Sequence, residues 1–222
     1  MALRKIAPEE RKQLRQVYAS KIMNAVRVKG FLSLTIQDLA DLMQISRASL
    51  YNYFTSKEDI IMEMTKLFIQ YTHEAERIIA NEEMSYAYRL LKVYEQSVLS
   101  AIYASDNYLH DLKASCVLLY EEKLEYKRER RAVVKHFYLK GMETGVFQEL
   151  NADILMMQEE ACLDKLFHSS FLVEADLSLK QALYDCYRAK EAQILRPEAE
   201  RVGREQLEEI VHNIVKRLTS NV

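Results

Sequence analysis

The stretch TIQDLADLMQISRASLYNYFTSK, from Thr35 to Lys57, decides the expected fold of the first part of the chain. Thr35 and Asp38 have the spacing of a capping box, in which a hydroxyl and a carboxylate each satisfy free amides at a helix start. Apolar residues follow at helical spacing and would form one buried face, namely Ile36, Leu39, Ala40 and Met43. The pattern predicts a short helix that begins after Thr35 and is followed by a turn at Gln44 and Ile45.

A second short helix is expected after the turn. Ser46 is a good N-cap, and Leu50 and Phe54, four residues apart, would face inward from a helix of about two turns. Upstream, Pro8 and the apolar residues after it predict a longer helix that ends at Gly30. Two short helices joined by a tight turn, with a third in front, are the parts of a helix-turn-helix, whose second helix enters the DNA major groove.

The outer face of this second helix carries groups that suit DNA. Arg47 can pair with guanine, Asn52 can read a base edge, and the Ala48 methyl can contact a thymine methyl. Hydroxyl and ammonium groups suit phosphate oxygens, and they are supplied by Ser49, Tyr51, Tyr53 and Lys57. An alternative stays open, in which the two tyrosines pack in the three-helix core and Thr35 and Ser46 are no more than helix caps.

Charge is divided unevenly along the chain, although the whole chain has a net charge of only −2. Up to Lys57 there are ten basic and four acidic residues, a net charge of +6, whereas the remainder carries 21 basic and 29 acidic residues, a net charge of −8. A basic head on an acidic body indicates an anionic partner for the head alone, and nucleic acid is favoured over a membrane surface.

From Gly30 to Lys57 the sequence closely resembles the DNA-binding head of the tetracycline-repressor (TetR) family of bacterial transcription regulators. That family has a Gly-aromatic pair, a Thr-capped second helix and a Ser-capped third helix that leads into a Leu-Tyr-x-Tyr-Phe-x-x-Lys signature. Here these elements read Gly30-Phe31, Thr35 to Ala40, Ser46 to Ser49, and LYNYFTSK from Leu50 to Lys57. The resemblance covers the head only; the rest of the chain agrees with the family in length and helical character.

The resemblance implies a role for each matching residue. The phosphate backbone would be held by Thr35, Ser49, Tyr51, Tyr53 and Lys57. Bases would be read by Gln37, Arg47, Ala48 and Asn52, and the Ser46 cap completes the expected DNA-binding site. One position departs from the family, whose turn is usually Ala-Gly-Val, because here the turn is Met43-Gln44-Ile45. Gln44 would cost stability if its φ is positive; alternatively, the turn differs in shape and changes the angle of the helix that follows it.

The remainder of the chain is expected to be helical. Glycine and proline number only 4 and 2, too few for a protein of many short strands. A long helix would begin near Lys57, capped by the Thr55-Ser56 pair, and run to about residue 80. Further helical patterns cover roughly 84–104, 106–128, 129–144, 152–173, 178–195 and 204–219. We therefore expect an all-α protein with a helix-turn-helix DNA-binding domain at 1–57 and a larger helical ligand-binding and dimerisation bundle at 58–222.

The resemblance also implies a dimer that forms through the last two helices of the body. An apolar seam fits this role and runs at helical spacing through Leu207, Val211, Ile214 and Leu218. The expected dimer interface combines this seam with Leu155, Cys162 and Leu166. Alternatively, the seam packs within one chain. An extra helical stretch from Ser178 to Leu195 departs from the family and would widen the interface or cover the ligand pocket.

Tyrosines crowd the middle of the body, where aromatic walls with polar tips would suit an amphipathic or cationic organic effector. The expected pocket residues are Phe68, Tyr71, Tyr103, Cys116, Tyr120 and Phe137. The five histidines lack the spacing of metal ligands, so neither a metal nor another cofactor is expected. The three cysteines contain no CxxC pair and read first as small buried apolar residues, with a redox-sensing role as the alternative.

Together these features predict a homodimeric repressor that binds a palindromic operator in double-stranded DNA and releases it when a small molecule binds the body. The alternative is a helical regulator that keeps the head but acts through protein partners, and the altered turn at Gln44 favours it. An enzyme is not expected, because the chain has no GxSxG, HExxH, GxGxxG or P-loop pattern. No apolar run could cross a bilayer and no signal peptide is present, so a cytoplasmic protein without a membrane partner is expected.

Overall fold

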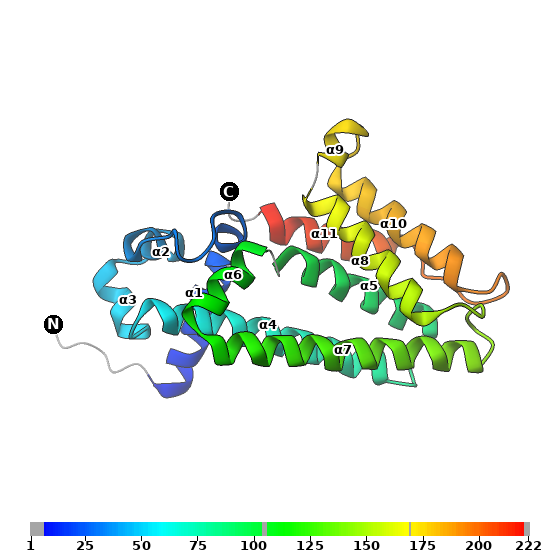
Figure 1. The fold of residues 1–222 in the computed structure, drawn as a ribbon, viewed down its shortest axis with the longest axis horizontal. Helices are drawn as coiled ribbons and strands as arrows, with labels where there is room; N and C mark the ends of the chain where they lie inside the picture. The colour runs from blue at the N-terminus through cyan, green and yellow to red at the C-terminus, as the bar shows by residue number, and fades with distance from the viewer. Residues whose placement is uncertain (1–6, 104–105, 169, 220–222) are drawn as a thin grey trace. The chain divides into compact units, whose positions relative to one another are not determined.

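The computed structural model describes residues 7–103, 106–168 and 170–219 (Figure 1). These residues are mostly helical, with one isolated antiparallel bridge between Phe147 and Leu195. The helices are α1 (Pro8–Lys29), α2 (Ile36–Met43), α3 (Arg47–Tyr53), α4 (Lys57–Ala80), α5 (Tyr86–Tyr103), α6 (Asp106–Ser115), α7 (Val117–Glu143), α8 (Ala152–His168), α9 (Phe171–Glu174), α10 (Leu179–Ile194) and α11 (Arg204–Thr219). The prediction of an all-α protein is confirmed. None of the described helices is long and apolar enough to span a membrane.

The chain divides into two compact units. The N-terminal unit combines Met1–Tyr71 with Tyr103–Glu125, and the C-terminal unit combines Thr72–Ile102 with Tyr126–Val222. Helix α6 and the first turns of α7 therefore pack with the first three helices. This division describes packing, so a functional boundary after Lys57 stays a prediction.

The core of the N-terminal unit forms where α1 packs against α2, α3 and α6. Its fully buried apolar side chains include Ile22, Val26, Leu39, Met43, Leu50 and Phe54. Tyr108 and Leu112 from α6 belong to the same core. The hydroxyl groups of Tyr108 and Thr65, 2.5 Å apart, join α6 to α4 inside it. The core thus holds the helix-turn-helix against both α4 and α6.

The chain breaks its helix at Cys116, between α6 and α7, and not near residue 128 as the sequence pattern predicts. The Cys116 amide still donates to the Leu112 carbonyl at 2.8 Å, and the Tyr120 amide donates to the Cys116 carbonyl at 3.1 Å. Because backbone hydrogen bonds continue on both sides and no glycine or proline marks the site, the sequence carries no local signal for this break. The sequence pattern also predicts one helix over 152–173, where the structure has two, α8 and the short α9.

Large rings fill the C-terminal unit. Tyr94, Tyr138 and Tyr187 are fully buried, and the Tyr94 hydroxyl donates to the Leu183 carbonyl at 2.7 Å. Phe147 lies against Gly141, where an added Cβ would be 2.1 Å from the Phe147 ring. The absence of a side chain at Gly141 is therefore what admits this ring.

The seam of α11 is buried within the single chain. Leu207, Val211 and Ile214 are 0, 0 and 1% exposed, and α11 packs against α10. This arrangement matches the alternative in which the seam packs inside one chain, and its partner is the extra helix. Leu155 and Leu166 of α8 are buried as well, whereas Cys162 is exposed and Leu218 half-buried. A helical repeat in a sequence cannot distinguish a partner helix in the same chain from one in another copy.

Candidate nucleic-acid interface

Helix α2 begins with the capping box that the sequence predicts. The Asp38 amide donates to Thr35 Oγ1 at 3.1 Å, and the Thr35 amide donates to Asp38 Oδ2 at 2.8 Å. The hydrogen bonds from the Thr35 side chain and backbone lower the pKa of the Asp38 carboxyl. The Thr35 hydroxyl also donates to Asp38 Oδ2 at 2.7 Å, so its role in the structure is that of a cap. Gln37, exposed on the first turn, donates to Asp41 at 2.8 Å.

The turn between α2 and α3 (Figure 1) places Gln44 in the left-handed region, with φ 61° and ψ 42°. The Gln44 and Ile45 amides donate back to carbonyls of α2, which closes the turn. A left-handed residue with a Cβ costs about 1 kcal/mol. The Lys21 ammonium of α1 donates to the Met43 carbonyl at 3.2 Å and to Gln44 Oε1 at 3.3 Å, so contacts of the turn partly offset this strain. The altered turn therefore still forms a helix-turn-helix.

Helix α3 presents its N-terminal half to solvent. Ser46 caps it by accepting from the Ser49 amide at 3.1 Å, while Leu50 and Phe54 are fully buried. The expected base-reading side chains of α3 are all exposed, namely Arg47, Ala48 and Asn52. Because the inner face is fixed by packing and the first turn by its cap, these side chains project from a rigid support.

The two tyrosines of α3 have different environments. Tyr51 is 47% exposed, and the Arg47 guanidinium lies 6.0 Å from its ring centre. Tyr53 is only 9% exposed and packs edge-on against Tyr18 of α1, with ring centres 4.9 Å apart. Burial and the hydrogen bond to Tyr53 raise the pKa of the Tyr18 hydroxyl. Of the two tyrosines, Tyr53 therefore packs in the core, as the alternative in the sequence analysis allowed. Tyr51 is exposed, as a phosphate contact requires.

Lys57, at the start of α4, faces the loop between α1 and α2. Its ammonium donates to the Leu32 carbonyl at 2.9 Å and lies 5.0 Å from the Phe31 ring centre. Since an ammonium has three donors, this bond leaves capacity for a phosphate. The Gly-aromatic pair and the lysine of the signature are therefore in contact, although the sequence separates them by about two dozen residues.

Sequence reasoning missed a charged clamp beneath α3, formed by Arg15, Asp59 and Glu63. The Arg15 guanidinium donates to Asp59 at 2.7 and 3.0 Å, to Glu63 at 2.8 and 3.0 Å, and to the Tyr53 carbonyl at 2.6 Å. The hydrogen bond from Arg15 holds the pKa of the Asp59 carboxyl at about 2. Asp59 also accepts from the Thr55 amide at 2.9 Å. The clamp joins α1, the end of α3 and the start of α4. The spacing of Asp59 and Glu63 places both carboxylates on one face of α4, but it does not identify Arg15 as their partner.

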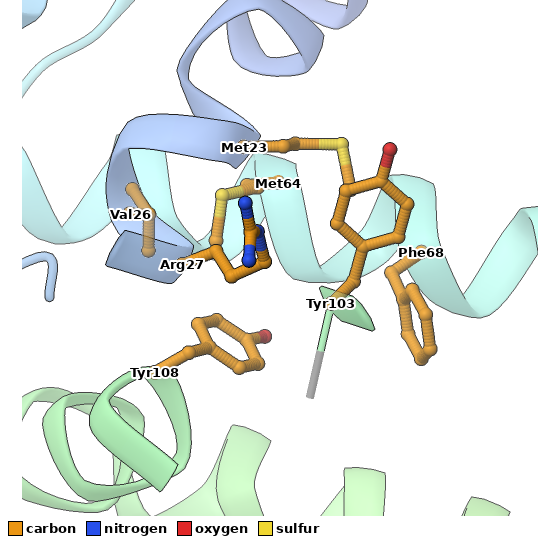
Figure 2. A pocket seen from close by; sticks show the side chains of 7 residues that line it. All are labelled: Met23, Val26, Arg27, Met64, Phe68, Tyr103 and Tyr108. Atoms are coloured by element: carbon orange, nitrogen blue, oxygen red, sulfur yellow. The ribbon is translucent and has the colours of Figure 1, made fainter. Parts of the chain in front are cut away.

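A small cavity of about 10 Å³ lies in the N-terminal unit, with side chains of α1, α4, α5 and α6 around it (Figure 2). It is lined by Met23, Val26, Arg27, Met64, Phe68, Tyr103 and Tyr108. A cavity of this size has room for roughly one water molecule. Two of the expected pocket residues, Phe68 and Tyr103, line it. Sequence reasoning missed Arg27 and the neighbouring Lys123, whose ammonium lies 4.0 Å from the Phe68 ring centre.

The other expected pocket residues lie elsewhere. Cys116 and Tyr120 are half-buried and pack against the N-terminal core. Phe137 belongs to an aromatic cluster of the C-terminal unit, with its ring centre 5.3 Å from that of Phe147. The side chain of Tyr71 is outside the described part of the structure. Expecting all six around one pocket was an inference from residue type, and residue type does not determine which aromatic rings meet.

Comparisons with known proteins agree with this geometry. Residues 23–64 match the family model of bacterial regulatory proteins of the tetR family. Similar solved structures include a ketosteroid transcriptional regulator of Mycobacterium tuberculosis, with TM-score 0.58 and 18% identity over 86% of this chain and 97% of that chain. A TetR transcriptional regulator from Chloroflexus aurantiacus has TM-score 0.57 and 15% identity over 85% of this chain and 100% of that one. A regulator from Saccharomonospora viridis in complex with choline has TM-score 0.58 and 17% identity over 85% and 99%. No curated protein matches the chain.

A helix-turn-helix whose reading helix is capped, packed and exposed in this way defines a DNA-binding transcription regulator. The match of residues 23–64 covers α2, α3 and the flanking parts of α1 and α4, which are the elements that build this surface. Residues 23–64 thus form a head that matches the tetR family of bacterial regulatory proteins, and the chain shares its fold with solved transcriptional regulators.

Proposed function

We propose that this regulator acts as a homodimeric repressor, which binds a palindromic operator through two copies of α3 and releases it when a small molecule binds. The observation that carries the proposal is the exposed set Arg47, Ala48, Tyr51 and Asn52 on a helix whose opposite face, Leu50 and Phe54, is fully buried. Base-reading groups stand beside groups that suit phosphate, as major-groove readers require. The rival hypothesis of a protein-interaction module rested on the turn at Gln44, and that turn closes normally.

Operator release requires that effector binding changes the position of α3, and α6 can transmit such a change within the N-terminal unit. Asp111 of α6 is 8% exposed, and its Oδ2 accepts from the Leu32 amide at 2.8 Å. The same loop is held by Lys57 through the Leu32 carbonyl. Gly30 fits here because its φ is 76° and an added Cβ would lie 2.8 Å from Asp111 Oδ2. A movement of α6 would therefore pull directly on the loop that precedes α2.

The effector would enter by widening the cavity between α1, α4, α5 and α6. Aromatic and methionine side chains line it, which suits an amphipathic molecule. The guanidinium of Arg27 lines the cavity, and this positive charge disfavours a cation. The Saccharomonospora viridis regulator was solved with choline, a cation. In this chain we propose an amphipathic effector with a neutral or anionic polar end.

Dimerisation would use the outer face of α8. Ile154 and Met157 are 47 and 51% exposed on this helix. The seam on α11 is already buried, so it offers little surface to a second copy. A two-fold axis would place two copies of α3 about one DNA turn apart, which requires a palindromic operator. Because the ligand must favour the state that does not bind DNA, equal affinity for both states would leave the operator occupied.

Fluorescence anisotropy with the DNA upstream of the chain's own gene tests the proposal. We expect salt-sensitive binding that exceeds binding to a shuffled duplex by about a thousandfold. Arg47→Ala should reduce that preference, whereas Lys57→Met should weaken binding to both duplexes alike. Lys180→Ala, an exposed change on α10, is the matched control and should leave both affinities unchanged. Equal binding to both duplexes by the unaltered protein would refute operator recognition.

A further inference from the structure

Two cysteines meet between α8 and α10 in the C-terminal unit. Cys162 Sγ and Cys186 Sγ are 3.4 Å apart, and both thiols are free. Cys162 is exposed and Cys186 is half-buried, so a small reagent can reach the first of them. The proposed function uses neither thiol.

The thiol contact is one step of a regular series between the two helices. Gln193 Nε2 donates to Gln158 Oε1 at 3.1 Å, and Lys190 forms an ion pair with Glu159. Residue numbers rise along α8 as they fall along α10, as in antiparallel helices. The Lys190 and Glu159 side chains are only 10 and 9% exposed. This buried ion pair, next to the cysteines along both helices, therefore fixes how α8 and α10 are aligned. The register of the helices therefore holds the two thiols at the same level.

We propose that Cys162 and Cys186 are a redox site, which forms a reversible intrachain disulfide when the protein meets a hydroperoxide. A disulfide has a sulfur–sulfur bond of about 2.05 Å, so the two sulfur atoms must approach by about 1.4 Å. Rotation of the side chains or a small approach of α8 to α10 supplies this distance. The inference concerns the thiols alone and does not depend on operator binding.

The environment assigns the first step to Cys162. The hydrogen bond from the Cys186 thiol lowers the pKa of the Cys162 thiol to about 7 and raises the pKa of the Cys186 thiol. The thiolate is the form of cysteine that attacks peroxides, and Cys162 is also the more exposed of the two. Cys186 is then placed to resolve the oxidised sulfur, as redox-sensing pairs require.

The chemistry balances with the hydroperoxide as the oxidant. The Cys162 thiolate attacks the terminal peroxide oxygen, the O–O bond breaks, and the alkoxide leaves and takes a proton to become an alcohol. This step leaves a sulfenic acid on Cys162. The Cys186 sulfur, after losing its proton, attacks the Cys162 sulfur and expels hydroxide, which takes that proton to form water. Two thiols are oxidised to one disulfide, and one hydroperoxide is reduced by two electrons.

Oxidation would connect α8 to α10 across the segment 163–185, which includes α9. A cross-link that closes such a segment restricts the unfolded chain, so the oxidised protein should melt at a higher temperature. The exposure of Cys162 and the approach that the bond requires both make the disulfide easy to reduce, since exposed or strained disulfides have the higher reduction potentials. The pair is therefore suited to switching and not to permanent reinforcement.

Peptide mapping of the full-length protein after treatment with cumene hydroperoxide tests the site. We expect a single linked peptide that joins Cys162 to Cys186, a fall from three free thiols to one, and full recovery with dithiothreitol. Cys116, half-buried in the N-terminal unit, serves as an internal control and should stay reduced. The oxidised protein should melt about 3 °C or more above the reduced protein.

Single variants separate the two roles. Cys186→Ser should stop at a sulfenic acid on Cys162, which dimedone traps, whereas Cys162→Ser should give neither the linked peptide nor the trapped acid. Three free thiols after treatment, or a link that involves Cys116 or a second chain, would refute the proposal. Because every readout is a mass, a thiol count or a melting temperature, failure here leaves operator binding untouched, and failure of operator binding leaves these results untouched.

Discussion

Each packing unit contains a cluster of charged side chains, and the clusters differ in how much water reaches them. Arg15, Asp59 and Glu63 in the N-terminal unit keep 20, 16 and 13% of their side-chain surface exposed, whereas Lys190 and Glu159 in the C-terminal unit keep 10 and 9%. The first cluster joins three helices beneath the DNA-reading surface, and the second joins α8 to α10 inside a helical bundle. The more a charge is buried, the more its loss leaves the partner without compensation.

The comparison predicts the largest loss of stability for Lys190→Met. This variant leaves the Glu159 carboxylate buried without the Lys190 ammonium, although Glu159 Oε2 still accepts a hydrogen bond from the Ser97 hydroxyl at 3.0 Å. The free energy of unfolding should fall by about 3 kcal/mol, measured by urea denaturation. Replacing both partners, Lys190→Met with Glu159→Gln, should recover more than half of that loss because no buried charge remains. Lys180→Met on the exposed face of α10 is the control; an equal effect of the two lysine changes would contradict the comparison.

Arg15→Met should have the next largest effect, a loss of about 2 kcal/mol, because water partly compensates the carboxylates that it leaves behind. The same change removes the 2.6 Å hydrogen bond to the Tyr53 carbonyl at the end of α3, so operator affinity should also fall. Arg11→Met is the matched control, since Arg11 reaches the same carbonyl only at 3.5 Å. Unchanged operator affinity in Arg15→Met would show that the clamp stabilises α1 and α4 without supporting α3.

Acid should weaken the cluster of Arg15, Asp59 and Glu63 through the Asp59 carboxyl. Asp59 has a pKa of about 2 in the folded protein, below its ordinary value of 3.8, so its contribution is present above that value and is lost as the pH falls toward 2. With solvent screening, this loss should be about 1 to 2 kcal/mol, and Asp59→Asn should remove it from the urea midpoint measured between pH 5 and 2. Burial alone would lower the pKa of the Lys190 ammonium, but the charge of Glu159 raises it above its ordinary value, so Lys190 keeps its charge throughout this acid range. If the urea midpoint of Asp59→Asn still falls steeply with acid, other carboxyls are responsible for the acid dependence.

Short-range patterns explain why the head could be predicted from the sequence. The capping box of Thr35 and Asp38, the Ser46 cap and the buried pair of α3 all involve residues three or four apart, and each is present. A positive φ at Gln44, which the sequence analysis raised only as a condition, is also present. Helix caps and helical periodicity depend on residues at these same short separations, so both can be predicted from the sequence alone.

The features that sequence reasoning missed depend on contacts between distant residues. Arg15 and Asp59 are 44 residues apart, and no local pattern indicates that they meet. The seam of α11 shows the same limit, because its periodicity was correct and its partner, α10, was not recognised. The break at Cys116 lacks any turn residue. Helix positions therefore followed from the sequence, whereas the pairing of helices required the structure.

The turn extends the comparison to an exposed contact of the N-terminal unit, in which Lys21 lies 3.3 Å from Gln44 Oε1. Gln44→Gly removes this contact but relieves the left-handed strain, and the freer unfolded chain of a glycine offsets part of the gain. A thermal melt should therefore show a small stabilisation, about 0.5 kcal/mol. Gln44→Ala keeps the strain and loses the contact, so it should be slightly destabilised. If Gln44→Gly instead lowers stability as much as Gln44→Ala does, the Lys21 contact stabilises the turn by more than the strain destabilises it. The exposed fraction of a charged contact would then not be enough to predict its contribution to stability.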